Sequence, residues 1–264
     1  MSEQQLLDAE EIAIPDISQL EIEDDKPVDN FQSEKQQRLL VEPLYTNSVL
    51  TTPFVAGANV GLFYSRKQEP LVPDAFISLN VQMPADWSQK QNRSYFVWEF
   101  GKAPEVAIEI VSNRKGKELG AKKEDYARVG IAYYAVFDPL QQIQETLQMN
   151  GALLRVYALT AGKYVEIESP FWLETVGIGL TLWTGTFEEQ PGLWLRWCDV
   201  KGDVIPTGKE LSERERQRAE REQQRAEQEQ QRAEQERLRA ENEQQRATRL
   251  AERLREMGVD PDTI

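Results

Sequence analysis

Two carboxylates lie where the sequence predicts the interior of a sheet. Glu109 falls within PEVAIEIVS (104–112), a run otherwise suited to a strand buried on both faces. An ionised carboxylate there costs on the order of several kcal/mol unless a partner or a metal compensates it. Asp74 follows Pro73 and precedes the apolar run AFISL, so it raises the same question. Two carboxylates on neighbouring strands repel each other unless a proton or a cation lies between them.

A lysine on the next predicted helix could join them. Lys122 shares one helical face with three apolar or aromatic residues spaced by three and four positions: Leu119, Tyr126 and Val129. That face should pack inward and carry the lysine toward Glu109. The three residue types together predict a site in which Asp74 and Glu109 hold a divalent metal through oxygen ligands, with Lys122 beside it.

A purely structural interpretation stays open for each residue. Asp74 could serve only as a turn or strand-start residue after Pro73. Glu109 and Lys122 could form an ion pair without chemistry, or Lys122 could extend to solvent. The combination favours a site, because perturbed charged groups cluster at functional centres.

The composition excludes several other kinds of chemistry. The chain has no histidine and a single cysteine, Cys198. Ser-His-Asp and Cys-His catalysis and histidine-based zinc sites are therefore excluded. An enzyme with this composition must use Asp, Glu, Lys, Tyr or Ser, together with a cation that prefers oxygen ligands.

The expected elements alternate strands with one clear helix. A further helix is expected over 31–47, and Gly130 should end the helix over 118–129. Strands are expected at 71–79, 93–100, 106–112 and 131–139, and a hairpin is expected from 152–159 and 163–168. A strand, a helix and a second strand within about 30 residues form a crossover unit, which predicts a mixed α/β sheet.

Composition also divides the chain into segments. The expected divisions are a flexible acidic arm at 1–30, a folded domain at 31–200, a linker at 201–211, a long charged helix at 212–257 and a C-terminal tail at 258–264. Alanine recurs every seven residues from Ala219 to Ala247, amid Gln, Glu and Arg. The repeat favours a weak coiled coil that could form a homo-oligomer, although a lone solvated helix is nearly as well supported.

The net charge of −14 is unevenly distributed. Residues 1–30 carry ten acidic residues and one basic residue, whereas residues 113–128 carry six basic and three acidic residues. The acidic excess therefore lies mostly outside the expected domain, and a polyanion remains an admissible substrate. The chain has no long apolar run and no signal-peptide pattern, so we expect a cytoplasmic protein without membrane segments.

Three stretches resemble a known family. PDAFISL, PEVAIEIVS and ELGAKKEDYARVGIAYYAVFDP are similar to the Uma-two family of restriction-endonuclease-like nucleases, within the PD-(D/E)XK superfamily. The resemblance covers about residues 45–200 and is most specific over 105–139. It implies a restriction-endonuclease-like mixed sheet with flanking helices, which hydrolyses DNA phosphodiester bonds with Mg²⁺, or alternatively Mn²⁺.

The resemblance also implies roles for the three residues. Asp74 and Glu109 would bind the metal, and Lys122 would assist hydrolysis. The superfamily pattern places a lysine two residues after the acid, where this chain has Val111. Lys122 would therefore replace it from the helix, with Lys115 and Lys117 as alternative donors.

Two other functions remain open on the sequence. An inactive nuclease-fold protein could serve as a coiled-coil assembly module, which Val111 and the acidic arm favour. A glycosidase using Asp74 and Glu109 as acid and base is possible on residue types alone. Loss of metal binding in Asp74 and Glu109 variants would distinguish the nuclease from both alternatives.

Overall fold

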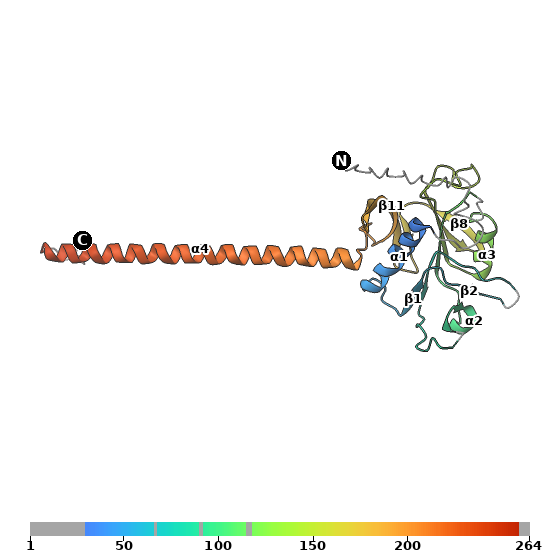
Figure 1. Cartoon of the computed structure of the whole chain (residues 1–264), viewed down its shortest axis with the longest axis horizontal. Helices are drawn as coiled ribbons and strands as arrows, with labels where there is room; N and C mark the ends of the chain where they lie inside the picture. Colours follow the sequence, from blue (N-terminus) through green and yellow to red (C-terminus); the bar gives the residue numbers. More distant parts are fainter. Residues whose placement is uncertain (1–29, 66–67, 90–91, 115–117, 259–264) are drawn as a thin grey trace, which may run out of the picture. The chain divides into compact units, whose positions relative to one another are not determined.

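A computed structural model describes residues 30–65, 68–89, 92–114 and 118–258 of the chain, which divides into two units at Gly208 (Figure 1). The helices of the first unit are α1 (Phe31–Thr46), α2 (Val97–Phe100) and α3 (Ala121–Val129). Its strands are β1 (Phe54–Gly57), β2 (Leu62–Phe63), β3 (Ala75–Leu79), β4 (Tyr95–Phe96), β5 (Val106–Ile110), β6 (Tyr133–Phe137), β7 (Leu154–Thr160), β8 (Lys163–Ile167), β9 (Phe171–Leu173), β10 (Ile178–Phe187) and β11 (Gln190–Cys198). The second unit contains α4 (Gly208–Glu256).

The main sheet of the first unit is mixed. Its six strands lie in the order β1-β3-β5-β6-β7-β8, and β5 and β6 pair in parallel whereas the other neighbours are antiparallel. Every residue of β3, β5 and β6 is buried, because these strands are apolar on both faces. The predicted crossover unit, β5-α3-β6, and the predicted β7-β8 hairpin are both confirmed.

The end of α3 is fixed by a glycine. Gly130 has φ 91°, a left-handed conformation that residues with a side chain adopt at a cost, and its N–H donates to the carbonyls of Tyr126 and Ala127. The chain can therefore turn directly into β6. This turn places α3 beside the strand that carries Glu109.

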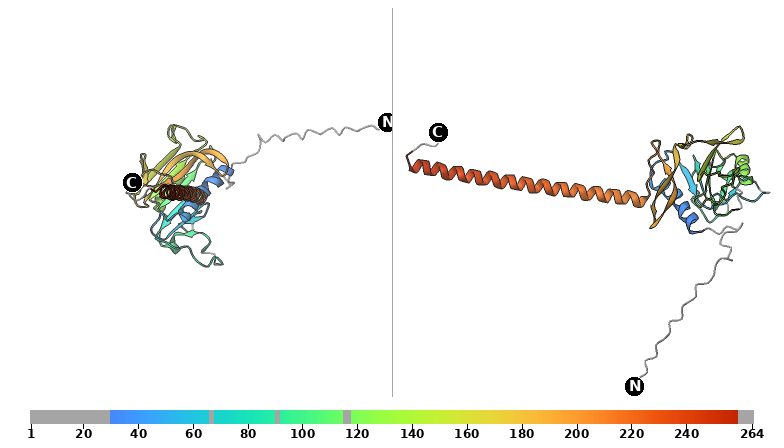
Figure 2. Two further views of the ribbon diagram at one scale, coloured as in Figure 1. Left: turned by 90° about the vertical axis from the view of Figure 1, so that its left-hand side faces the viewer. Right: turned by 90° about the horizontal axis from the view of Figure 1, so that it is seen from above.

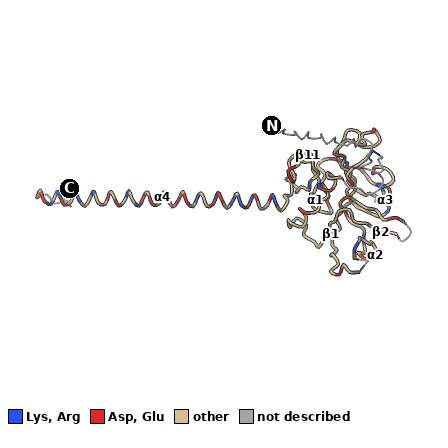
Figure 3. Tube along the Cα trace, in the orientation of Figure 1, with Lys and Arg blue, Asp and Glu red and all other residues tan. Residues whose placement is uncertain are grey.

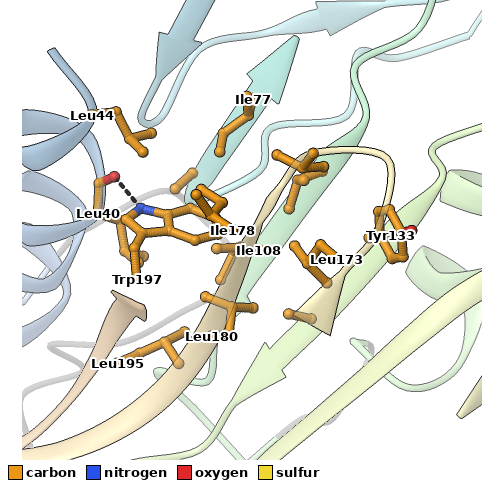
Figure 4. Packing of buried hydrophobic residues seen from close by; sticks show 14 of the residues in the cluster. Leu40, Leu44, Ile77, Ile108, Tyr133, Leu173, Ile178, Leu180, Leu195 and Trp197 are labelled. Atoms are coloured by element: carbon orange, nitrogen blue, oxygen red, sulfur yellow. Dashed lines mark hydrogen bonds between the residues drawn. The ribbon is translucent and has the colours of Figure 1, made fainter. Parts of the chain in front are cut away.

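Both faces of the sheet are covered. One face packs against α1 and the small antiparallel sheet β11-β10-β9, where the indole N–H of Trp197 donates to the carbonyl of Leu40 at 2.7 Å (Figure 4). The other face packs Phe76 and Ala107 against Tyr126 of α3. The side chain of Glu109 lies on this second face, since it is two residues from Ala107.

The strand expected over 93–100 is wrong for most of its length. Only Tyr95 and Phe96 are extended, and the chain then makes the short helix α2, which ends at Gly101 with φ 74°. The ring of Phe100 returns to stack on Tyr95 with a centroid separation of 4.3 Å. The aromatic run therefore packs as a turn on its own first residue instead of continuing a strand.

The segment 201–211, expected as a linker, contains a bridge to the end of β11 and the start of α4. Ile205 is buried and its N–H donates to the carbonyl of Trp197, so this segment folds back onto β11. The long helix then begins at Gly208, four residues before the expected start, because good helix formers follow Gly208 directly.

The second unit is one uninterrupted helix of 49 residues (Figure 2). Basic and acidic residues alternate along it (Figure 3), and the residues of exposed ion pairs such as Arg218–Glu222 lie one turn apart. No residue of α4 is buried. The coiled coil stays a prediction, and the arm at 1–29 and the end at 259–264 lie outside the described residues.

Candidate active site

The two carboxylates come from adjacent antiparallel strands. Ala75 pairs with Ile108, so the same register, continued by one residue, places Asp74 opposite Glu109. Asp74 lies just before β3, and its Oδ2 accepts a hydrogen bond from the backbone N–H of Ile110 at 2.6 Å. That bond connects the start of β3 to the end of β5 and holds the two acids at one end of the sheet.

Glu109 is buried, and both of its carboxylate oxygens accept hydrogen bonds from side chains of α3. Its side chain is 3% exposed, Oε2 accepts from Lys122 Nζ at 2.8 Å, and Oε1 accepts from the Tyr126 hydroxyl at 2.6 Å. Lys122 and Tyr126 are four residues apart and share one helical face, as predicted. A cation and a hydroxyl therefore compensate the carboxylate that the apolar strand buries. Each oxygen keeps a further lone pair, so a metal could still bind.

Lys122 is charged at neutral pH. Burial lowers its pKa, but the attraction and hydrogen bond of Glu109, with smaller contributions from Glu118 and Asp74, raise it by more, and the net shift is upward. Its side chain is 37% exposed. Lys122 can therefore act as a hydrogen-bond donor and a positive charge at the site, but not as a general base.

The Asp74 carboxyl has a pKa far above the usual value for an aspartate. Burial and the neighbouring Glu109 raise its pKa to about 7, against the opposing effects of the Ile110 N–H, Gln37 and Lys122. Gln37 of α1 donates from Nε2 to Asp74 Oδ1 at 2.9 Å. The Asp74 carboxyl therefore takes up a proton far more readily than an ordinary aspartate, mainly because it is buried and secondly because it lies near Glu109.

Asp74 should make the metal-free protein less stable as pH rises. Its folded pKa of about 7 exceeds the unfolded value of 3.8, so the folded state binds the extra proton between these values. The stabilising contribution is present below about pH 4 and is lost as pH rises through 7, by on the order of 2–4 kcal/mol. Urea unfolding of the metal-free protein across this range should show the loss.

The Asp74→Asn variant provides the comparison. It cannot ionise, so the difference in unfolding free energy between it and the parent should grow in favour of the variant up to about pH 7. A difference that does not change with pH would show that Asp74 has an ordinary pKa.

Two residues of the site were missed by sequence reasoning. Gln37 lies in α1, far away in sequence, and nothing in its neighbourhood indicates a bond to Asp74. Glu118 precedes α3 and is only 7% exposed, and its Oε2 has no hydrogen-bond partner in the structure. Burial, followed by the repulsion of Glu109, raises the pKa of Glu118. The position of Glu118, four residues before Lys122, is the signal that could have revealed it, because this spacing is one helical turn.

The donor set fits a hard cation. Asp74 and Glu109 lie opposite each other across a strand pair, and Lys122 forms an ion pair with Glu109. Among the described residues, no group of three or more His, Cys, Asp or Glu side chains is arranged to hold a metal. Asp74 and Glu109 would therefore hold it with backbone oxygen and water, which suits Mg²⁺ or Mn²⁺.

The other lysines do not supply a described alternative. Val111, at the position where the superfamily pattern has lysine, is 1% exposed and packs in the apolar cluster on the α3 side of the sheet. Lys115 and Lys117 lie outside the described residues. Lys122 is therefore the described lysine that contacts Glu109.

The comparison with protein families decides the affiliation. The model of the Uma2 family, described as "Putative restriction endonuclease", matches residues 8–178, which is well over half of the chain and includes Asp74, Glu109 and Lys122. The chain belongs to the Uma2 family. The restriction-endonuclease-like mixed α/β fold and the family resemblance predicted from the sequence are both confirmed.

Solved structures also include a similar chain. A crystal structure titled as a "putative nuclease belonging to DUF820" from Anabaena variabilis ATCC 29413 is 16% identical, with a TM-score of 0.39 over 56% of this Uma2 chain and 73% of that chain. The search of curated proteins gave no match. No helix in the described part of the Uma2 chain is long and apolar enough to cross a bilayer.

Proposed function

We propose that this Uma2 protein is an endonuclease that hydrolyses DNA phosphodiester bonds with Mg²⁺, or Mn²⁺ in its place. One observation carries the proposal: Lys122 reaches Glu109 from α3, while Asp74 lies opposite Glu109 in the strand register. An acid pair can hold a divalent metal, and a nearby lysine can stabilise the charge that develops on a phosphate, so the arrangement suits metal-dependent phosphodiester hydrolysis without a histidine.

Each residue would have a distinct role. Asp74 and Glu109 would hold the metal at the end of the sheet, in the orientation that the Ile110 N–H, Gln37 and Tyr126 impose. When bound, the metal would polarise the phosphate and lower the pKa of the attacking water. The Lys122 ammonium would donate a hydrogen bond to the phosphate oxygens, where negative charge increases during the reaction.

A cavity with more basic than acidic side chains supports a polyanionic substrate. It has a volume of about 560 Å³, lies between α3 and β8, and is lined by Lys123, Arg128 and Lys163 together with one acid, Glu124. Lys123 also lies 3.5 Å from the centroid of the Tyr157 ring. These cations could contact flanking phosphates and position a strand without reading its sequence.

Metal removal is the first test of the proposal. Supercoiled plasmid DNA should be nicked or linearised in Mg²⁺ or Mn²⁺, and EDTA should abolish the cleavage until excess metal is restored. Asp74→Asn should lower the rate by at least about 100-fold, because it weakens one metal ligand. The matched control is Asp199→Asn, which alters an exposed aspartate in the turn after β11 that accepts hydrogen bonds from backbone N–H groups. Cleavage that persists in EDTA would contradict a metal mechanism.

Two observations favour a second candidate function. Val111 is packed in the core where the superfamily pattern has lysine, and α4 presents 49 residues of which none is buried. An inactive nuclease-fold protein that associates through α4 is consistent with both features. It predicts no cleavage with either metal, and a loss of self-association when α4 is deleted.

A further inference from the structure

A second cavity of the first unit lies on the same face of the sheet as Glu109. Its volume is about 290 Å³, and its lining includes Phe76, Tyr95 and Phe100 together with Met83 and Trp87. Phe76 and Tyr95 are almost fully buried, whereas Trp87 is 63% exposed and Met83 is 48% exposed. Large apolar side chains that face solvent beside an aromatic cavity indicate a binding site.

One residue that lines the cavity, Phe76, lies close to the candidate active site. Phe76 is two residues after Asp74 on β3, which places the two about 7 Å apart along the strand. It also pairs with Ala107, two residues before Glu109, so its ring lies on the face where Lys122 contacts Glu109. If a phosphate is bound at Asp74 and Glu109, a base in the cavity would therefore belong to a nucleotide one or two positions along the same strand.

The walls of the cavity are aromatic, and the rings that form them already pack against one another without a ligand. The rings of Phe76 and Tyr95 meet edge to face at 5.4 Å, and Tyr95 stacks on Phe100. Gly57 makes room for the first ring, because a Cβ there would come within 2.8 Å of Phe76. Flat aromatic walls around a volume near the lower end of small-molecule sites suit one planar ring system.

The segment that carries Trp87 is held by its own hydrogen bonds. Arg93 donates to the carbonyls of Trp87 and Ser88 at 2.9 and 2.6 Å, and Asp86 accepts from the N–H and hydroxyl of Ser88. The guanidinium thus holds the backbone that carries the exposed indole, and it adds positive charge to the lining of the cavity, where a nucleotide would bring its phosphate.

We propose that this cavity binds one unstacked nucleobase of the DNA strand that is cut, with the base stacked on Trp87. The proposal rests on the proposed nuclease function and names what its substrate presents beside the cleaved bond. A paired base cannot enter the cavity, because its faces are covered in the duplex and unstacking costs energy. The protein should therefore prefer single-stranded, mismatched or base-damaged DNA over a fully paired duplex.

The test uses full-length protein carrying Glu109→Gln, so that bound DNA is not cut. Two fluorescently labelled 12-nucleotide probes are compared by anisotropy: a single-stranded DNA and an abasic strand of the same length, which keeps the phosphates but lacks the bases. Trp87→Ala should weaken binding of the DNA by roughly 5- to 150-fold, the usual range for loss of one base–aromatic stack, and leave the abasic probe unaffected. Trp87→Phe should retain most of the affinity.

Trp98→Ala is the matched control, because Trp98 is also exposed, at 45%, but does not line the cavity. It should change neither affinity. Equal weakening of both probes by Trp87→Ala, no weakening of either, or an equal loss in Trp98→Ala would overturn the base-binding cavity. The nuclease function would fail in a different way. In that case the parent protein would not cut DNA with either metal, but base-dependent binding through Trp87 would persist.

Discussion

Glu109→Gln is expected to reduce metal-dependent DNA cleavage by at least about 1,000-fold while leaving the protein folded. The amide removes a charged metal ligand, and a loss of about 4 kcal/mol of transition-state stabilisation corresponds to that factor. The amide oxygen can still accept from the Tyr126 hydroxyl, whose 2.6 Å bond to Oε1 is one of the two contacts of the carboxylate. Initial rates of plasmid cleavage at saturating Mg²⁺ provide the measurement.

Stability and a matched variant separate chemistry from folding in this experiment. The free energy of unfolding should change by about 1 kcal/mol or less, because the variant loses an ion pair but also no longer buries a charge. Glu105→Gln is the control: Glu105 pairs with Lys102 and accepts from the Leu79 N–H on the same sheet, away from the acid pair. It should retain cleavage. Equal loss of activity in both variants would indicate a general structural effect instead of a metal ligand.

Lys122→Met should affect both activity and stability, in distinguishable ways. Loss of the ammonium should lower cleavage roughly 100- to 1,000-fold, as for removal of one donor from a site where charge develops. It also leaves the Glu109 carboxylate buried without a cation. The expected cost in unfolding free energy is about 1–3 kcal/mol, below the range for fully buried pairs because Lys122 is 37% exposed and solvent screens its charge.

A double mutant tests the origin of that stability loss. Lys122→Met combined with Glu109→Gln should regain most of the lost unfolding free energy, since no uncompensated charge then remains, but it should not regain activity. Lys102→Met serves as the control for loss of a lysine from a comparable ion pair. Additive losses in the double mutant would contradict the pairing of Lys122 with Glu109.

The sequence predicted the elements whose signals are local. The apolar run around Glu109 predicted β5. The helical face shared by Lys122 and Tyr126 predicted which side of α3 packs inward, and Gly130 predicted where α3 ends. Each depends on periodicity or on a conformation that one residue type favours. The contact of Lys122 with Glu109 follows from these elements, because a crossover helix packs on the strand that precedes it.

The features that sequence reasoning missed depend on side-chain packing, in one case between segments far apart in the sequence. Gln37 reaches Asp74 only because α1 docks on the sheet, and that docking includes the Trp197 bond to Leu40, across a separation of 157 residues. The short helix α2 forms where an aromatic run suggested a strand, because Phe100 stacks on Tyr95. No window of local sequence contains both partners of the long-range contacts.

The coupling of Asp74 and Glu109 through a metal is the central claim, and calorimetry tests it most directly. Mg²⁺ and Mn²⁺ are titrated into the purified full-length protein and into the Glu109→Gln variant under the same conditions. The account predicts saturable binding by the parent and its loss in the variant. Absence of binding in both proteins, or equal binding in both, would contradict it and leave Glu109 as a structural residue paired with Lys122.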